Sequence, residues 1–355
     1  MNTFGNSFRI SIFGESHGEC IGCTIDGLPA GFKPNLSLID EELKLRSPRV
    51  DYGSTSRRES DNYKIISGYY SERCTGMPLT VFFQNTDTKS FDYSKCIARP
   101  CHADYTASVK YHGNNDFRGG GSFSGRLTAP LVFAGTLAKQ LLNKYDIKIA
   151  SHIQRIGRLT DRSYNAVMND FPKLDRSFPL IDNSLRSSFE SELLRARTNG
   201  DSVGATVEAA VLNLPIGVGE PFFNSTESCL SHILFSIPGV RGIEFGSGFE
   251  LAEHYGSEVN DQFEIGGRTV TNHSGGINGG LTNGMPLIFR LCFRPIPSIA
   301  KPQSMLNLDT GDTVISSING RHDACIIPRG CVIVEACTAL AIYDLVLQYK
   351  LNGVI

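Results

Sequence analysis

Three histidines of this chain lie in short segments that also carry glycine or proline together with hydroxyl, arginine or carboxylate side chains. They are His17 in residues 14–18 (GESHG), His102 in residues 99–104 (RPCHAD) and His322 in residues 320–323 (GRHD). An imidazole can give and take a proton near neutral pH, and glycine lets the backbone turn so that such side chains face a ligand. Asp104 is close enough in sequence to orient the ring of His102. These segments predict acid–base chemistry on a bound molecule.

Two glycine-rich segments indicate what kind of molecule is bound. Residues 118–126 (RGGGSFSGR) precede an expected apolar helix, and residues 272–284 (NHSGGINGGLTNG) precede a strand that ends in residues 294–298 (RPIPS). Main-chain N–H groups before a helix, together with serine hydroxyls and arginines, form a natural anion site. The chain has 22 arginines and only 12 lysines, and the planar guanidinium suits carboxylates and phosphates. The predicted ligand is therefore polyanionic.

The composition argues against several other classes of protein. The chain has 355 residues, of which 41% are hydrophobic and 20% charged, so it can bury a large core and is not expected to be disordered. A net charge of −2 gives no reason to expect nucleic acid or an anionic membrane as a partner. The most apolar stretch, residues 332–347, is interrupted by Glu335 and Asp344, so no membrane-spanning helix is expected.

The ten cysteines are expected to be free thiols. The N-terminal residues lack the charged and then apolar run of a signal peptide, which favours a reducing compartment, the cytoplasm. Cys20 and Cys23 form a C-x-x-C pair with no second pair, so no metal site is predicted. The nucleotide-binding patterns G-x-G-x-x-G and G-x-x-x-x-G-K-[ST], and the G-x-S-x-G pattern of acyl hydrolases, do not occur.

Apolar periodicity predicts both strands and buried helices. Residues 128–145 and 329–349 are apolar nearly all round, which is typical of helices buried between layers. Shorter helices are expected from Ser37, with Asp40 completing a capping box, and from Thr226. Alternating or short apolar runs predict strands at residues 8–13, 79–83, 147–153, 203–211 and 287–293.

The order of these elements predicts the fold class. Residues 28–31 (LPAG) and 214–217 (LPIG) each follow an expected strand and precede an expected helix, which indicates an internal repeat. No segment of linker composition separates the halves. We therefore predict one domain over residues 1–355, of the α+β class: a layered β-α-β sandwich with buried central helices between antiparallel sheets and two pseudo-repeated lobes.

Five motifs, taken in this order, resemble the chorismate synthase family: GESHG, RP-x-HAD, RGGG-x-x-S-x-R, GGINGG and GRHD. The resemblance extends from residue 4 to about residue 347. It implies a lyase that removes phosphate from 5-enolpyruvylshikimate 3-phosphate by 1,4-anti elimination to give chorismate, in the shikimate pathway of aromatic amino acid biosynthesis. It also implies a requirement for reduced FMN without net redox change, and a homotetramer of β-α-β sandwich subunits with an internal duplication.

The resemblance also assigns roles to residues. By matching positions, His17 would be the general acid near the leaving phosphate, His102 would protonate the reduced flavin, and Asp323 would take part in proton removal through flavin N5. The substrate-binding residues would be Ser16, Arg46, Arg99, Ser124, Arg126 and Arg321. The FMN-binding residues would be Ser122, Phe123, Ser124, Pro238, Gly239, Gly279, Arg294, Pro295, Ile296, Pro297, Ser298 and Arg321.

Some positions depart from the family pattern. Cys101 replaces the usual glycine and is expected to be buried as a small neutral residue. Tyr52 stands where many relatives have a second substrate arginine, which Arg49, Arg57 or Arg58 could replace. Two further departures are Ser122, where an arginine is common, and Leu127, where a glutamate is frequent.

Three questions stay open at this point. A different FMN-dependent enzyme acting on an anionic metabolite, or a protein that only stores FMN or a polyanion, would carry part of the same pattern. The sequence also leaves open whether the chain reduces its own flavin with NADPH.

Overall fold

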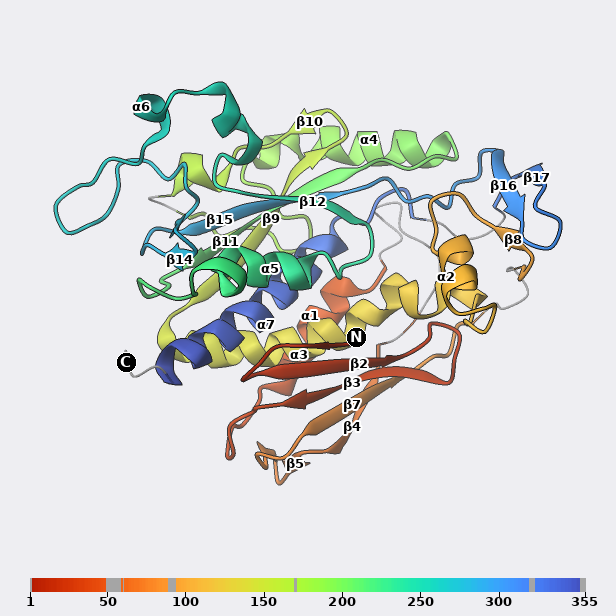
Figure 1. The fold of residues 1–355 in the computed structure, drawn as a ribbon, viewed down its shortest axis with the longest axis horizontal. Coiled ribbons are helices and arrows are strands. Elements are labelled where there is room, and N and C mark those ends of the chain that lie inside the picture. Colours follow the sequence, from red (N-terminus) through yellow and green to blue (C-terminus); the bar gives the residue numbers. More distant parts are fainter. Residues whose placement is uncertain are drawn as a thin grey trace.

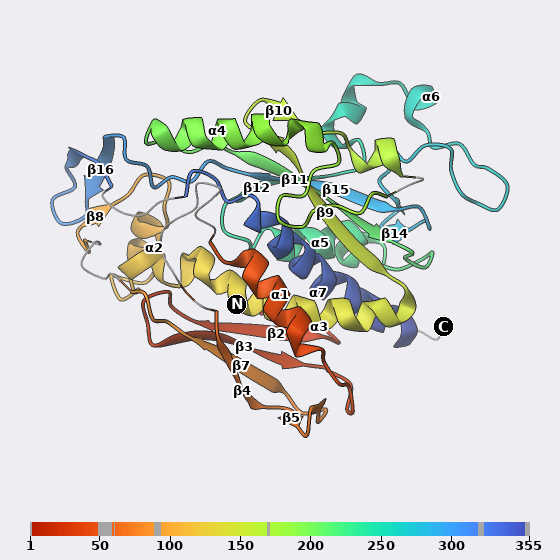
Figure 2. The ribbon, with the colours of Figure 1, turned by 180° about the vertical axis from the view of Figure 1, so that it is seen from behind.

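The computed structural model describes residues 2–48, 59, 61–88, 94–168, 171–318 and 323–351. Arg321, His322, Tyr52, Arg49, Arg57 and Arg58, all singled out above, lie outside these residues. Within the described part, two antiparallel sheets enclose a layer of helices, and both views show the same order of layers (Figures 1 and 2). This mixture of helix and antiparallel sheet agrees with the predicted α+β class.

The first sheet comes from the N-terminal part of the chain. Its strand order is β1-β2-β3-β7-β4, and every neighbouring pair is antiparallel. Ile21, Cys23 and Ile25 alternate along β3 and are fully buried, so one face of this strand is in the core. The strands span Thr3–Phe4 (β1), Arg9–Gly14 (β2), Cys20–Asp26 (β3), Tyr63–Ser67 (β4) and Leu79–Gln84 (β7).

The second sheet lies on the other side of the helices. Its strand order is β10-β9-β11-β15-β12, again antiparallel throughout. The strands span Lys148–Ile156 (β9), Leu159–Thr160 (β10), Ala205–Leu212 (β11), Val240–Phe245 (β12) and Leu287–Phe293 (β15). The strands predicted in both sheets therefore agree with the structure to within a few residues.

Helices α3, Thr128–Leu142, and α7, Arg329–Leu351, run through the middle layer. Thirteen of the fifteen residues of α3 are buried, which explains why its sequence is apolar nearly all round. The two helices cross at Gly135, where an added Cβ would lie 2.5 Å from the backbone of Ala336. Only glycine permits this close approach. Helices α1, Leu36–Arg46, and α5, Thr226–Leu234, complete the layer.

The N-terminus of α1 differs from the prediction. The side chain of Asn35 caps the helix by accepting from the main-chain N–H of Leu38 at 3.3 Å, so the capping box at Ser37 and Asp40 was wrong. Asparagine one residue before the helix supplies the oxygen that the free N–H groups need. For α5 the cap is Ser225, directly before the predicted start at Thr226.

The two predicted repeat segments occupy equivalent places. Residues 28–31 connect β3 to α1, and residues 214–217 connect β11 to α5. Gly31 and Gly217 both have positive φ, 80° and 92°. The same turn thus leads from a central strand to a middle-layer helix in each half of the chain.

The remaining elements lie outside the three layers or at their ends. They are β5 (Tyr69–Tyr70), β6 (Arg73–Cys74), β8 (Ile97–Ala98), β13 (Ile277–Asn278), β14 (Leu281–Thr282), β16 (Gln303–Asn307), β17 (Thr313–Ser316), α2 (Asp104–Lys110), α4 (Arg186–Thr198) and α6 (Gly256–Val259).

Helix α7 is long and apolar enough to cross a membrane by length and composition. In this structure 94% of its most apolar window is buried inside the protein, as in the core helix of a globular fold. Its apolar surface is therefore accounted for by packing against α3, α5 and the second sheet.

A buried carboxylate of α7 joins the two ends of the chain. Asp344, 4% exposed, accepts from the main-chain N–H groups of Asn6 (3.0 Å), Ser7 (2.7 Å) and Phe8 (2.8 Å). These groups lie in the turn between β1 and β2. The N-terminal edge of the first sheet is thus attached to the last helix.

A second group of charges, built around two buried carboxylates, connects three elements of the helix layer. Lys139 of α3 binds Glu335 of α7 at 2.6 Å and Glu42 of α1 at 3.1 Å. Arg176 binds the same two carboxylates, at 2.9 and 2.6 Å. We call these four residues the helix-layer cluster.

Candidate active site

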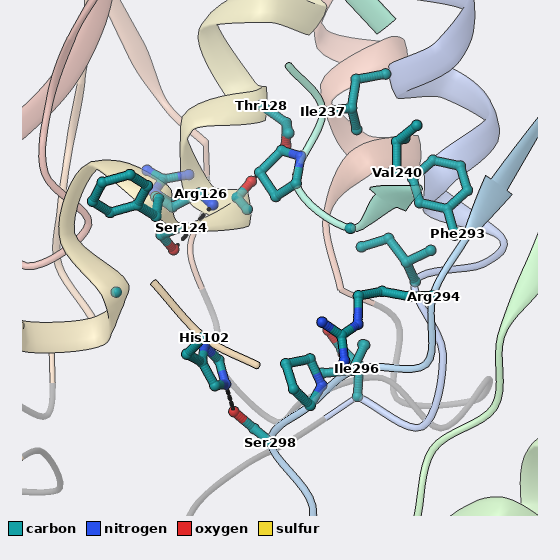
Figure 3. A pocket seen from close by; sticks show the side chains of 18 of the residues that line it. His102, Ser124, Arg126, Thr128, Ile237, Val240, Phe293, Arg294, Ile296 and Ser298 are labelled. Carbon is teal, nitrogen blue, oxygen red and sulfur yellow. Dashed lines mark hydrogen bonds between the residues drawn. The ribbon is translucent and has the colours of Figure 1, made fainter. Parts of the chain in front are cut away.

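The largest gathering of predicted site residues surrounds a cavity of about 620 Å³. This volume suits a small molecule or a cofactor. Its walls come from the end of α1, the turns before α2 and α3, the segment between α5 and β12, the residues after β15 and the beginning of α7. In Figure 3, Ser124 and Arg126 lie on one side of the pocket, and Phe293, Arg294 and Ile296 on the opposite side.

Most residues implied by the resemblance line this one cavity. They are Arg46, Arg99, His102, Ser122, Phe123, Ser124, Arg126, Pro238, Gly239, Arg294, Ile296, Pro297, Ser298 and Asp323. Four described residues of the implied set are not part of the lining: Ser16, His17, Gly279 and Pro295. Arg321 lies outside the described residues.

Ser16 and His17 are directly behind the glycine-rich turn. Gly119 lines the cavity, and a Cβ at this position would overlap the ring of His17 and the hydroxyl of Ser16. The Ser16 hydroxyl lies 3.1 Å from His17 Nδ1 and donates to the carbonyl of Gly119 at 3.0 Å. Gly119, Gly120 and Gly121 have φ of 61°, 86° and 52°. Positive φ and contact with His17 together require glycine here.

Gly279 and Pro295 occupy different surroundings. Gly279 is exposed in the turn between β13 and β14. Its neighbour Gly280 packs against Ser225, at the start of α5. Pro295 lies between two lining residues, Arg294 and Ile296.

Arg46 and Arg126 meet at a carboxylate that the sequence analysis did not select. Arg46, the last residue of α1, donates from Nε to Asp61 Oδ2 at 2.9 Å. Arg126 forms an ion pair with Asp61 Oδ1 and donates from Nε to Asn85 Oδ1 at 3.2 Å. Burial alone would raise the pKa of Asp61, but Arg46 and Arg126 outweigh it and hold this pKa below its usual range. Asp61 is therefore an ionised bridge between two guanidiniums.

Two sets of contacts hold the side chains of the segment around His102. Asp104 accepts from Arg99 Nε at 2.7 Å, from its NH2 at 2.8 Å and from its main-chain N–H at 3.0 Å. His102 Nε2 lies 2.7 Å from the hydroxyl of Ser298 (Figure 3). Asp104 thus fixes the arginine, and Ser298, a residue beyond the end of β15, contacts the imidazole of His102. His102 is also close enough to Asp104 to help lower the pKa of that carboxyl, which burial alone would raise and Arg99 lowers most.

Cys101 corrects another expectation. It lines the cavity and is exposed rather than buried. Its φ of 60° lies in the left-handed region, which is unfavourable for a residue with a Cβ. The turn requires this backbone conformation, and the side chain therefore points away from the core.

Two further arginines line the cavity, Arg329 at the start of α7 and Arg241 on β12. Arg329 forms an ion pair with Asp323, while its buried Nε has no hydrogen-bond partner in the described part of the chain. Burial and the nearby Arg46 lower the pKa of Arg329 to about 9. The dipeptide Pro328-Arg329, just after the GRHD motif, is the sequence signal that could have identified this residue.

The described lining therefore carries more positive than negative charge. Its cations are Arg46, Arg99, Arg126, Arg241, Arg294 and Arg329, and its carboxylates are Glu59, Asp104 and Asp323. When Asp61, which lies behind the wall, is added to these carboxylates, the arginines still outnumber them. A cavity with this balance attracts an anionic ligand.

Comparison with known proteins places the chain in a family. The family model described as "Chorismate synthase" matches residues 8–347. A relative named chorismate synthase from Dehalococcoides mccartyi is 40% identical over 354 residues, covering 98% of this chain and 97% of the relative. The chain belongs to the chorismate synthase family. Another relative named chorismate synthase, from Chitinophaga pinensis, is 42% identical, and the match covers 100% of this chain and 99% of the relative.

The fold agrees with that of a solved member. A crystal structure described as chorismate synthase superposes on this chain with a TM-score of 0.74 and 24% sequence identity. The match covers 97% of this chain and 93% of the chain in that crystal structure. The resemblance stated from the motifs is thus confirmed at the level of the chorismate synthase family.

Proposed function

We propose that this chain catalyses the family's reaction, the 1,4-anti elimination of phosphate from 5-enolpyruvylshikimate 3-phosphate to give chorismate, with reduced FMN as cofactor. The observation that carries the proposal is the composition of one cavity. Six arginines, the His102 ring and the Asp323 carboxylate face the same space beside an apolar wall. A substrate with two carboxylates and a phosphate needs such a concentration of fixed cations.

In this proposal the arginines divide between two ligands. Arg46, Arg126 and Arg99 would hold the substrate's anionic groups, with Ser124 adding a hydrogen bond. Arg321 would contribute from outside the described residues. These side chains come from the α1 end, the glycine-rich turn and the turn before α2, so they approach the ligand from several directions.

The opposite side of the cavity fits FMN. Ile237, Val240 and Phe293 give an apolar surface for a flat ring, and Arg294 supplies a cation for the phosphate (Figure 3). Gly239 has φ of 93°, and a Cβ added there would meet only one atom of the described residues within 4 Å, so the backbone at this position is open to a ligand. When bound, reduced FMN supplies the electron density that lets phosphate leave without a net change of oxidation state. The residues in contact would also include Ser122, Phe123, Pro238, Ile296, Pro297 and Ser298.

Three side chains would handle protons. His17 would act as general acid for the leaving phosphate, next to Gly119 in the cavity wall. His102, oriented by Ser298, would hold a proton near the flavin. Asp323, paired with Arg329, would take part in removing the C6 hydrogen. Each would act by positioned proton transfer.

The assembly and location of the protein are also part of the proposal. We propose one β-α-β domain formed by duplication, because the strand–turn–helix units at residues 20–46 and 205–234 correspond. A homotetramer accounts for the arm between β12 and β13, where the large apolar side chains Phe249, Phe263 and Ile265 are 83%, 81% and 105% exposed. The ten free cysteines are compatible with the cytoplasm.

The decisive experiment is turnover of 5-enolpyruvylshikimate 3-phosphate under anaerobic conditions with dithionite-reduced FMN. Equal amounts of phosphate and chorismate are expected, and FMN should be recovered reduced. Phosphate release without chorismate would indicate a different lyase. FMN binding without any phosphate release would indicate a storage protein, and either result would overturn the proposal. A parallel aerobic assay with NADPH and FMN tests whether the chain reduces its own flavin.

A further inference from the structure

Asp61 is a buried acidic residue inside a site that has to bind anions. Its side chain is 1% exposed, and both of its oxygens are engaged. Oδ2 accepts from Arg46 Nε at 2.9 Å and from the Ser47 hydroxyl at 2.8 Å, and Oδ1 is paired with Arg126. A carboxylate placed here repels the expected ligand, so its presence calls for another explanation.

The two arginines explain it. Arg46 and Arg126 come from different elements, and the side chain of each is only 4% exposed. Two buried guanidiniums repel each other strongly where water is excluded. Asp61 lies between them and binds both, so their mutual repulsion is compensated while the trio keeps one net positive charge.

The same contacts fix the direction in which each guanidinium points. Arg126 is held on three sides, by Asp61, by the Asn85 side chain at 3.2 Å and by the carbonyl of Gln84 at 3.5 Å. Arg46 is held through Nε and one terminal nitrogen. Among the described residues, these contacts use fewer N–H donors than a guanidinium has. Because both arginines line the cavity, the contacts fix the orientation in which each guanidinium faces it.

We infer that Asp61 is a positioning residue, which holds Arg46 and Arg126 in the arrangement that receives the anionic groups of the substrate. The inference rests on the proposed function for the identity of that substrate. It assigns Asp61 an effect on substrate binding rather than on FMN binding, because one of its partners, Arg126, lies on the side of the cavity opposite Arg294 (Figure 3).

The substitution Asp61→Asn separates this role from simple repulsion. The substitution removes a negative charge. If the carboxylate only repelled the substrate, its loss would lower KM. If the carboxylate positions the two arginines, its loss would raise KM, because misplaced binding groups weaken the interaction with substrate by up to about 100-fold. We expect KM for 5-enolpyruvylshikimate 3-phosphate to rise about 10- to 100-fold, with the FMN dissociation constant unchanged. Asp61→Glu should recover part of the loss.

Two controls keep the test decisive. Ser47→Ala removes one hydrogen bond from a neutral donor to the same carboxylate and should raise KM by a smaller factor. This variant remains informative if Asp61→Asn does not fold. Glu42→Gln changes another buried carboxylate that lies between two cations but belongs to the helix-layer cluster. It should leave KM unchanged.

The outcomes distinguish this inference from the proposed function. If the wild-type chain does not turn over the substrate, the proposed function fails, and calorimetric binding of the same substrate to wild type and to the variants still tests Asp61. A folded Asp61→Asn variant whose KM, or substrate dissociation constant, is unchanged or lower would overturn the inference.

Discussion

The helix-layer cluster and the cavity are two groups of charges built on the same helices, and they differ in balance. In the cluster, Lys139 and Arg176 face Glu42 and Glu335, so positive and negative charges are equal. In the cavity, six arginines of the described lining outnumber the carboxylates. Balanced buried charges satisfy one another and fix the fold, whereas an excess of one sign is left for a ligand.

The two groups are neighbours along the chain. Glu42 and Arg46 are four residues apart on α1, so they lie on the same side of the helix, one turn apart. Glu335 and Arg329 are both on α7, six residues apart. The cluster and the cavity therefore use different residues of the same helices. The comparison separates residues that should affect stability from residues that should affect ligand binding and turnover.

The largest expected effect is on the cavity side. His17→Ala should lower turnover about 100- to 10,000-fold, because a positioned general acid contributes a factor of this size. FMN affinity should remain close to that of the wild type, since His17 lies next to Gly119 and is not among the proposed FMN contacts, and the thermal midpoint shows whether the variant keeps its fold. Stopped-flow chorismate formation and a thermal melt measure the two quantities. Wild-type turnover in this variant would remove His17 from the mechanism.

The next effect tests the helix-layer cluster. Lys139→Met removes a cation that lies between two buried carboxylates. Breaking such a pair leaves charge uncompensated, so the free energy of unfolding should fall by about 3 kcal/mol. KM for the substrate should stay unchanged in the folded fraction. Urea unfolding and steady-state kinetics provide both values. A large change of KM at unchanged stability would contradict the division between the two groups.

A smaller effect is expected at the cofactor side of the cavity. Arg294→Ala should weaken FMN binding about 10- to 100-fold, because a hydrogen bond to a charged group contributes roughly 1.5–3 kcal/mol. Flavin fluorescence titration measures the affinity. Arg195→Ala is the matched control, since Arg195 is exposed on α4 and paired with Glu192. Equal affinities in both variants would place the flavin phosphate elsewhere.

The smallest expected effect is on the stability of the protein at acidic pH. Burial would raise the pKa of Glu42, but Lys139 and Arg176 outweigh it and lower this pKa below its ordinary value of 4.5. A lowered carboxylate pKa contributes stability above pH 4.5, and this contribution is lost as the pH falls through the lower value. The wild type should therefore lose unfolding free energy below about pH 4.5, by less than Lys139→Met costs. Glu42→Gln should flatten that part of the profile, and an unchanged profile would exclude Glu42 as the cause.

The sequence predicted the elements better than the contacts between them. Strands and buried helices follow from periodicity within about ten residues, which is why α3 and β15 were located closely. Residues of RPCHAD and RGGGSFSGR and the described Asp323 of GRHD line one cavity, whereas GESHG lies behind the glycine-rich turn and GGINGG lies elsewhere. Recognition of the family supplied their order and their roles.

The contacts that were missed are long-range. Ser298 and His102 are 196 residues apart, and Asp61 and Arg126 are 65 apart. Such pairs depend on how sheets and helices pack, which local patterns do not encode. The sequence analysis also missed Arg99 as a partner of Asp104, although Arg99 offers it three N–H donors at once. Cys101 was misplaced because residue type was weighed without the backbone conformation that the turn requires.

The carboxylate of Asp344 has a consequence for biosynthesis. The amide group of Phe8 leaves the ribosome 336 residues before its acceptor is made. Until residue 344 has been made, the N–H groups of Asn6, Ser7 and Phe8 lack this acceptor, so the turn between β1 and β2 gains its final contacts only with the last helix. A nascent chain stopped shortly before residue 344 would therefore lack contacts at its first turn as well as in its last helix.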